Sequence, residues 1–200
     1  MGRSIRQFVT LITVFTVPLS SIIASTIEGQ PGVGTKEGTF EKIIQKSNKS
    51  SSKVNGKEVN YCLWYNPNNW ELLKENLNDV AEYSFKLSNG DAYAMIIPEK
   101  EITPIQEAPY IIFEGAKLSG VENIKILKME NHLVNGIEVL YLTWSGEIMN
   151  TKFTYMYNIY SGKNGTVQVV AYTLDDLLNE KQEEMENLLN GFCIHEKNLY

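Results

Sequence analysis

The segment Ile137–Glu147 (IEVLYLTWSGE) limits the possible folds most, because it is apolar on both sides of an extended strand. Successive side chains of a strand point to opposite faces. One face carries Ile137, Val139 and Tyr141, and the other carries Leu140, Leu142 and Trp144. A strand with one solvent-exposed face would have polar residues at every second position. We therefore expect a sheet that is covered by helices on both sides.

The rest of the chain supplies further strands and three helices. The expected strands are Tyr61–Tyr65, Val80–Ser88, Asp91–Ile97, Asn123–Glu130, Lys152–Ser161 and Val167–Thr173. The expected helices are Trp70–Leu77, about Pro109–Leu118, and Leu174–Asn190 with Thr173 as its cap. Hairpin signals such as Asn89-Gly90 join the strands, and no alternating strand–helix run occurs. This order predicts an α+β fold, arranged as a three-layer α/β/α sandwich around an antiparallel sheet.

Residues 1–25 have the layout of a secretory signal peptide. Two arginines form a positive start, and Phe8–Val17 (FVTLITVFTV) is an apolar run. Ala24 or Ser25 is expected to be the last residue removed. The alternative is a membrane anchor, but a spanning helix needs roughly 20 apolar residues, and Pro18 breaks the shorter run here. We expect an exported protein, periplasmic or secreted, without a stable membrane anchor after cleavage.

The net negative charge of the chain limits which classes of partner it can bind. The formal net charge of −6 becomes −8 once Arg3 and Arg6 leave with the signal peptide. Nucleic acids and anionic lipids are bound by patches of lysine and arginine. The acidic balance therefore argues against nucleic acid as a partner, and its simplest role is solubility.

The segment 26–57 is predicted to be a flexible polar lead-in. It contains several glycines and the run Lys46–Lys53 (KSNKSSSK), which cannot bury enough apolar surface to offset its ordering entropy. Only Phe40–Gln45 is expected to form a helical turn. The folded domain is expected to span 58–194 and to be followed by a tail at 195–200.

Cys62 and Cys193 are the two cysteines of the chain. An even number of cysteines in an exported chain suggests one disulfide. Such a bond would join the first predicted strand to the residues after the last helix, and in the chain-entropy model it would stabilise the fold by roughly 4–5 kcal/mol. The alternative is two buried free thiols. Metal binding is not expected, because neither cysteine has a second ligand at CxxC spacing.

The two histidines are the natural candidates for acid–base chemistry. His132 is expected in an exposed loop over Asn131–Gly136, and His195 in the tail, so both are interpreted as solvated. No G-x-S-x-G elbow accompanies them. A Cys193–His195 dyad is conceivable, although a disulfide would consume the thiol. The sequence predicts no catalytic, cofactor-binding or metal-binding residues, no cofactor, and no enzymatic activity.

Two groups of side chains leave alternatives open. The acidic residues of the last predicted helix are Asp175, Asp176, Glu180, Glu183, Glu184 and Glu186. They are interpreted as a solvated helix face, and the alternatives are an acidic docking face or a weak cation site. The aromatic residues of the central sheet include Trp144, Tyr155, Tyr157 and Tyr160. They are interpreted as core residues, and the alternative is an aromatic-lined ligand pocket.

Several fold-determining segments resemble those of the PsbP-like fold. They are Leu63–Trp70 (LWYNPNNW), Asn135–Ile137 (NGI), Val169–Thr173 (VVAYT) and Leu188–Phe192 (LLNGF). The resemblance spans about Tyr61–Phe192. The PsbP-like fold is shared by extrinsic photosystem subunits, a Ran-binding nuclear import factor and bacterial exported proteins of the DcrB type. Most of these proteins bind partners or act as accessory proteins, and the resemblance implies the same role here without transferring any site residue.

We therefore expect an exported, non-catalytic binding or accessory domain that recognises a protein or cell-envelope partner. One alternative is a small-ligand carrier with an apolar pocket between helix and sheet. Another is a hydrolase with a carboxylate-based site, which would need paired carboxylates with perturbed pKa values in a cleft.

Overall fold

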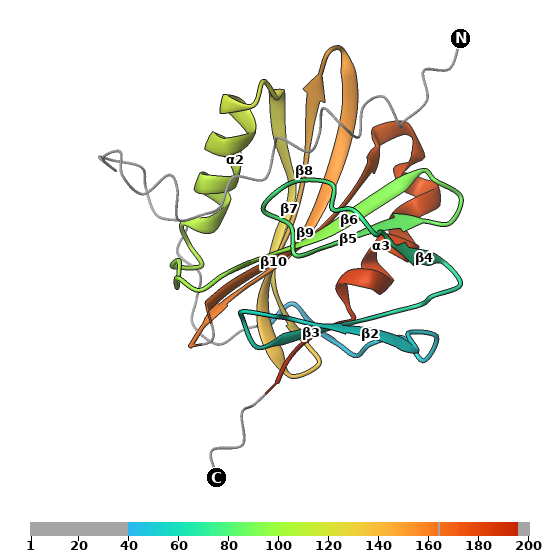
Figure 1. The fold of residues 1–200 in the computed structure, drawn as a ribbon. Coiled ribbons are helices and arrows are strands. Elements are labelled where there is room, and N and C mark those ends of the chain that lie inside the picture. The colour runs from blue at the N-terminus through green and yellow to red at the C-terminus, as the bar shows by residue number, and fades with distance from the viewer. Residues whose placement is uncertain (1–39, 164, 196–200) are drawn as a thin grey trace.

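Two sheets and two α-helices make up the part of the chain that the computed structural model describes, residues 40–163 and 165–195 (Figure 1). The strands are β1 (Lys42–Ile44), β2 (Ser52–Asn55), β3 (Tyr61–Tyr65), β4 (Trp70–Leu72), β5 (Tyr83–Leu87), β6 (Ala92–Glu99), β7 (Glu122–Val134), β8 (Ile137–Ile148), β9 (Thr151–Gly162), β10 (Gly165–Leu174) and β11 (Phe192–Ile194). The helices are α2 (Ala108–Leu118), the 3-10 turn η2 (Asp175–Leu177) and α3 (Leu178–Leu189). The predicted signal peptide and its cleavage site at Ala24 or Ser25 lie outside the described residues.

The larger sheet has eight strands in the order β1-β7-β8-β9-β10-β6-β5-β4, and the smaller has the order β11-β3-β2. All neighbouring strands are antiparallel except β1 and β7, which are parallel. The predicted α+β class is confirmed, but the large sheet is mixed rather than antiparallel. The direction of β1 was not predictable from turns, because a long stretch of chain rather than a hairpin separates it from β7.

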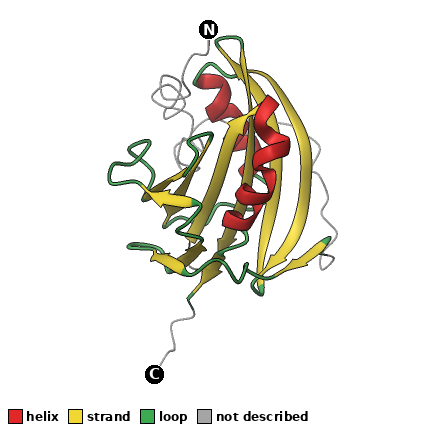
Figure 2. Cartoon of the chain, turned by 90° about the vertical axis from the view of Figure 1, so that its right-hand side faces the viewer, coloured by secondary structure: helices red, strands yellow, loops and turns green. Residues whose placement is uncertain are grey.

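The large sheet separates two hydrophobic cores. Leu140, Leu142 and Trp144 of β8 belong to one core, which also contains residues of α2. Val139 and Tyr141 belong to the other core, together with residues of α3 and of the small sheet. The predicted division of β8 side chains between two buried faces is thus confirmed. Figure 2 shows α3 in front of the strands, and the buried residues of the helix include Met185, Leu188 and Leu189.

Four local predictions were wrong because tertiary pairing outweighs local periodicity. Trp70–Leu77 is not a helix: its first residues form β4, which pairs with β5 and buries the indole of Trp70. Phe40–Gln45 contains β1 rather than a helical turn. The predicted loop Asn131–Gly136 is strand as far as Val134. Thr173 does not cap the last helix, because its hydroxyl donates to the Asp91 carbonyl at 2.6 Å.

The predicted lead-in needs a further correction. Both β1 and β2 fall inside 26–57, so ordered structure begins well before residue 58. Among the described residues, no helix is long and apolar enough to cross a membrane.

Candidate functional site

The run Lys46–Lys53, predicted to be flexible, forms an ordered loop that ends in β2. The Lys46 backbone N–H donates to Oδ1 of Asn135 at 2.8 Å, and the Ser50 N–H donates to the Ser47 carbonyl at 3.0 Å. Ser50 itself is buried. The run is therefore held by its backbone and one small side chain, while most of its lysines stay at the surface.

The half-buried indole of Trp64 lies beside this loop on the outer side of the small sheet. Alternation along β3 directs Tyr61 and Leu63 into the core and leaves Trp64 on the other side. Lys53 pairs directly with Trp64 across the strands. Its Nζ lies 5.1 Å from the indole centroid, and the Nζ of Lys46 lies 4.9 Å from it, which are cation–π distances. We call Trp64, Lys46, Lys53 and Lys49, which belongs to the same loop as Lys46, the Trp64 face.

The predicted disulfide between Cys62 and Cys193 is present, and it holds the strands under this face together. The two residues are partners in the β3–β11 register, with Cα atoms 5.0 Å apart. Next to the disulfide, the backbone N–H of Trp64 donates to the backbone carbonyl of Gly191 at 2.9 Å. A Cβ atom on Gly191 would overlap the Trp64 carbonyl oxygen, so glycine is required there. The early strand β3 and the last strand β11 thus meet beneath Trp64.

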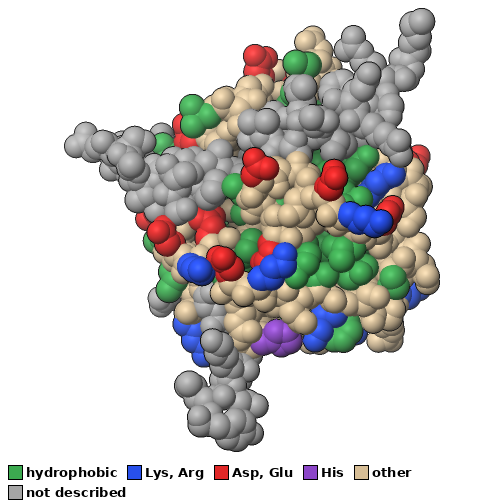
Figure 3. Space-filling view, in the orientation of Figure 1, with side chains coloured by type: hydrophobic (Ala, Val, Ile, Leu, Met, Phe, Trp, Pro, Cys, Tyr) green, Lys and Arg blue, Asp and Glu red, His purple; other side chains and the backbone are tan. Residues whose placement is uncertain are grey.

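The lysines of the Trp64 face have no carboxylate partner, unlike five of the other lysines among the described residues. Five lysines elsewhere pair with carboxylates: Lys100 with Glu58, Lys117 with Glu114, Lys128 with Glu130, Lys152 with Asp175, and Lys181 with Asp91. Figure 3 shows such intermixed acidic and basic side chains on one side of the molecule. Among the described residues, none of the lysines in the Trp64 face has an ion-pair partner. The stretch Lys42–Lys57 contains five lysines and no acidic residue.

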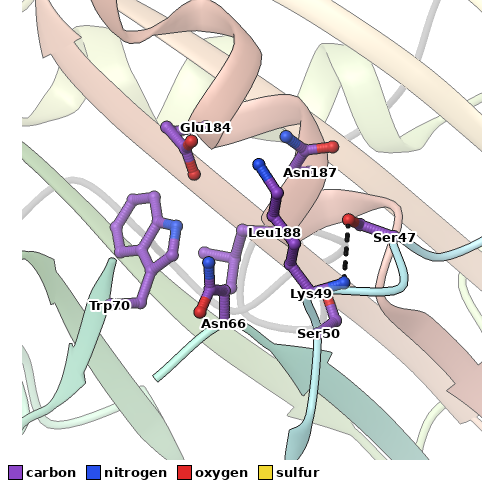
Figure 4. Close-up of a pocket in the computed structure, with 8 residues that line it drawn as sticks. All are labelled: Ser47, Lys49, Ser50, Asn66, Trp70, Glu184, Asn187 and Leu188. Atoms are coloured by element: carbon purple, nitrogen blue, oxygen red, sulfur yellow. Dashed lines mark hydrogen bonds between the residues drawn. The ribbon is translucent and has the colours of Figure 1, made fainter. Parts of the chain in front are cut away.

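A small pocket adjoins the Trp64 face on its α3 side. It is lined by Ser47, Lys49, Ser50, Asn66, Trp70, Glu184, Asn187 and Leu188, and its volume of about 10 Å³ is room for about one water molecule. Figure 4 shows Lys49 reaching across it towards α3. The buried indole N–H of Trp70, which lines the pocket, has no hydrogen-bond partner among the described residues. One water molecule would satisfy that donor.

His132, predicted to be a solvated loop histidine, is instead buried in β7 at 2% exposure. Its ring stacks on Tyr141 at a centroid distance of 4.7 Å, and Nε2 lies 2.9 Å from Oε2 of Glu130. The hydrogen bond with His132 lowers the pKa of Glu130, with a further contribution from Lys128. Burial raises the pKa of Tyr141 to about 12. The prediction failed because β7 runs four residues further than its apolar pattern indicated.

The other candidates from the sequence are placed in structural roles. Cys193 is in the disulfide, so the Cys193–His195 dyad does not exist, and His195 instead contacts Asn55 Oδ1 at 3.0 Å. Burial alone would raise the pKa of Asp175, but hydrogen bonds from Lys152 and Thr154 outweigh it and lower that pKa. No group of three or more metal-ligating side chains occurs within the described ranges.

Four aromatic residues of the central sheet form a packed row in the α2-side core, whereas Tyr160 packs against Phe192 beside the other core. Trp144, Tyr155, Tyr172 and Tyr93 are partners in register across four neighbouring strands. Successive ring centroids are 4.2, 5.7 and 5.9 Å apart. These contacts are those of core side chains, which agrees with the main interpretation of the sequence pattern.

The sequence did not reveal the Trp64 face as a candidate site. Its signal was present in the five lysines without an acidic residue, but the serines and asparagine between them indicated disorder. The position of Lys46 over Trp64 depends on how the loop Lys46–Lys53 packs against β3. A local sequence pattern does not predict that packing.

This architecture defines the class of the molecule as an α+β protein with the PsbP-like fold, as the sequence predicted. The fold is similar to that of cyanobacterial PsbP (CyanoP) from Synechocystis sp. PCC 6803, with a TM-score of 0.57 and 11% identity over 82% of this chain and 99% of that chain. LpqN of Mycobacterium tuberculosis, described as involved in cell envelope biogenesis, has a TM-score of 0.48 and 15% identity over 72% of this chain and 90% of its own. No protein-family model and no curated protein matches the sequence.

Proposed function

We propose that this protein is an exported, non-catalytic binding or accessory domain that recognises a protein or cell-envelope partner through the Trp64 face. The observation that carries the proposal is the set of lysines held around one half-buried indole without carboxylate partners. Aromatic residues are enriched where proteins bind one another, and unpaired surface charge steers association.

Export is supported by the predicted signal peptide and by the disulfide. Disulfides persist mainly in oxidising compartments such as the periplasm and the extracellular space. The cross-link from β3 to β11 therefore fits a protein that folds after export.

The Trp64 face lies on the side of the small sheet that faces away from the core. We interpret α2 and α3, which contribute to the two separate cores, as the outer layers of a three-layer α/β/α sandwich. Both faces of the large sheet are then occupied by the protein itself. The small sheet, in contrast, has only its inner side in the core.

The two alternative functions have less support. A carrier needs a cavity of roughly 300 Å³ or more for a drug-sized ligand, whereas the pocket beside Lys49 has room for about one water. A hydrolase needs a base next to a nucleophile or a positioned water. Glu130 and His132 form a hydrogen-bonded pair, but the Glu130 pKa is lowered and His132 is buried against Tyr141.

Site-specific photo-crosslinking in cells that export the full chain tests the proposal. A photoreactive amino acid replaces Lys53 in one variant and Lys125 in the other; both are exposed lysines on strands. We expect one discrete cross-linked species from position 53 and none from position 125. Equal cross-linking from both positions, or none from position 53, would contradict a binding role for the Trp64 face.

A further inference from the structure

Two lysines of the Trp64 face share one aromatic ring. Lys46 and Lys53 both lie within about 5 Å of one indole centroid, so their like charges repel one another. A half-buried ring attracts each cation, which offsets part of that repulsion. No carboxylate within the described part of the chain neutralises them. The remaining positive charge is available to an anionic partner.

The backbone segments that carry Lys46 and Lys53 are held in place by hydrogen bonds. The Lys46 backbone is held by Asn135, whose side-chain N–H groups also donate to the carbonyls of Asn190 and Phe192 at 2.8 and 2.7 Å. Lys53 is held in β2 opposite Trp64. A rigid arrangement lowers the entropy that binding must otherwise remove. The backbone beneath the face is therefore ordered, and two of its lysines lie over the indole of Trp64.

Building on the proposed function, we infer that the Trp64 face binds an acidic segment of a protein partner. The patch is small, with three lysines, and the whole chain has a net charge of −6. Anionic membranes are bound by clusters of about 4–8 basic residues, and long-range repulsion by an acidic protein weakens that attraction. A short run of aspartate or glutamate side chains matches three ammonium groups in charge.

Binding of fluorescein-labelled hexaglutamate to the purified, disulfide-bonded protein tests this inference. The variant K46Q/K49Q/K53Q removes the charges of the face and keeps side chains of similar length. The variant K74Q/K125Q/K163Q is its control, since these exposed lysines also lack an ion-pair partner among the described residues. Fluorescence anisotropy gives the dissociation constants, and circular dichroism confirms that both variants fold.

We expect the wild type and the control to bind hexaglutamate alike, and the face variant to bind about tenfold or more weakly. Labelled hexaglutamine should not bind, and added salt should weaken hexaglutamate binding. Equal affinities of the two variants, or no binding by the wild type, would overturn the inference. Binding to phosphatidylglycerol vesicles but not to hexaglutamate would also overturn it.

A charge-reversed variant covers the case in which the glutamine variant fails to fold. K46E/K49E/K53E should lose hexaglutamate and gain binding to labelled hexalysine, and failure to gain it contradicts the inference. If position 53 still cross-links to a partner while hexaglutamate does not bind, the proposed function stands and the acidic-segment inference falls.

Discussion

The two hydrophobic cores, called here the α3 side and the α2 side after the helix that contributes to each, are built in different ways. On the α3 side, the helix backbone comes close to β10, β3 and β9, and the disulfide fixes the small sheet. On the α2 side, large aromatic side chains such as Trp144 and Phe113, whose centroids are 5.7 Å apart, lie between helix and sheet. The α3 side therefore depends on contacts and a disulfide between distant parts of the chain. The α2 side depends on the packing of large aromatic side chains. The Trp64 face lies on the cross-linked side, where a fixed surface is possible.

Loss of the disulfide should have the largest effect and should act on the α3 side. In the chain-entropy model a loop of 131 residues contributes roughly 5 kcal/mol. We expect C62S/C193S to unfold at much lower urea concentration than the wild type. Hydrogen exchange should show early loss of protection in β3 and β11 while β8 and β9 stay protected. Identical urea midpoints for the two proteins would refute this view of the α3 side.

Trp144→Ala should have the next largest effect, and it tests the role of volume on the α2 side. Removal of a fully buried tryptophan costs about 4 kcal/mol, because a cavity remains, and Trp144 is 1% exposed. Tyr110→Ala on the outside of α2, where the side chain is 49% exposed, should change the free energy of unfolding by no more than about 0.5 kcal/mol. Urea denaturation followed by circular dichroism measures both. A small effect at Trp144 would show that α2 hardly depends on the aromatic row.

Removal of the hydroxyl group should affect the free energy of unfolding differently at two buried tyrosines. The Tyr172 hydroxyl, in the α2-side core, is buried without a hydrogen-bond partner among the described residues. Tyr172→Phe should therefore be neutral or should stabilise by up to about 1 kcal/mol. The Tyr61 hydroxyl, in the other core, donates to Glu82 Oε2 at 2.8 Å, and Tyr61→Phe should cost about 1–2 kcal/mol. Thermal unfolding distinguishes these outcomes, and a clear loss at Tyr172 would reveal a partner for its hydroxyl.

The smallest expected effect is a dependence of stability on pH through Glu130. The folded-state pKa of Glu130 is below its ordinary value of 4.5, chiefly because of the hydrogen bond with His132. A lowered carboxyl pKa gives stability that is present above the unfolded-state pKa and is lost as the pH falls through the folded-state pKa. Carboxyl titration by NMR should show a higher Glu130 pKa in His132→Phe, and acid should then destabilise that variant less steeply. An unchanged Glu130 pKa would contradict the role of His132.

The parts of the fold that the sequence predicted are those with a local signal. The two buried faces of β8, the hairpin at Asn89-Gly90, the helix α2 and the pairing of Cys62 with Cys193 follow from alternation, turn residues, proline position and cysteine count. Each depends on residues close in sequence or on the only possible pairing. These predictions agree with the structure because local interactions determine each of these features.

The parts that the sequence missed depend on contacts between distant segments. Trp70 has helical spacing to its neighbours but pairs with Leu87 in the sheet. β1 forms because β7 offers a free edge at His132 to Val134. The Trp64 face needs the loop at Lys46, β2 and β3 to meet, and only the folded chain brings them together.

In the compartment where the protein works, the Trp64 face should be covered by its partner. Acetylation of lysines in intact cells and in the purified protein, each followed by mass spectrometry, compares the reactivity of every lysine in the two states. We predict that Lys46, Lys49 and Lys53 react much less in cells than in the purified protein, while Lys74 and Lys125 react equally in both. Equal reactivity of the first three lysines in cells and in the purified protein would contradict the claim.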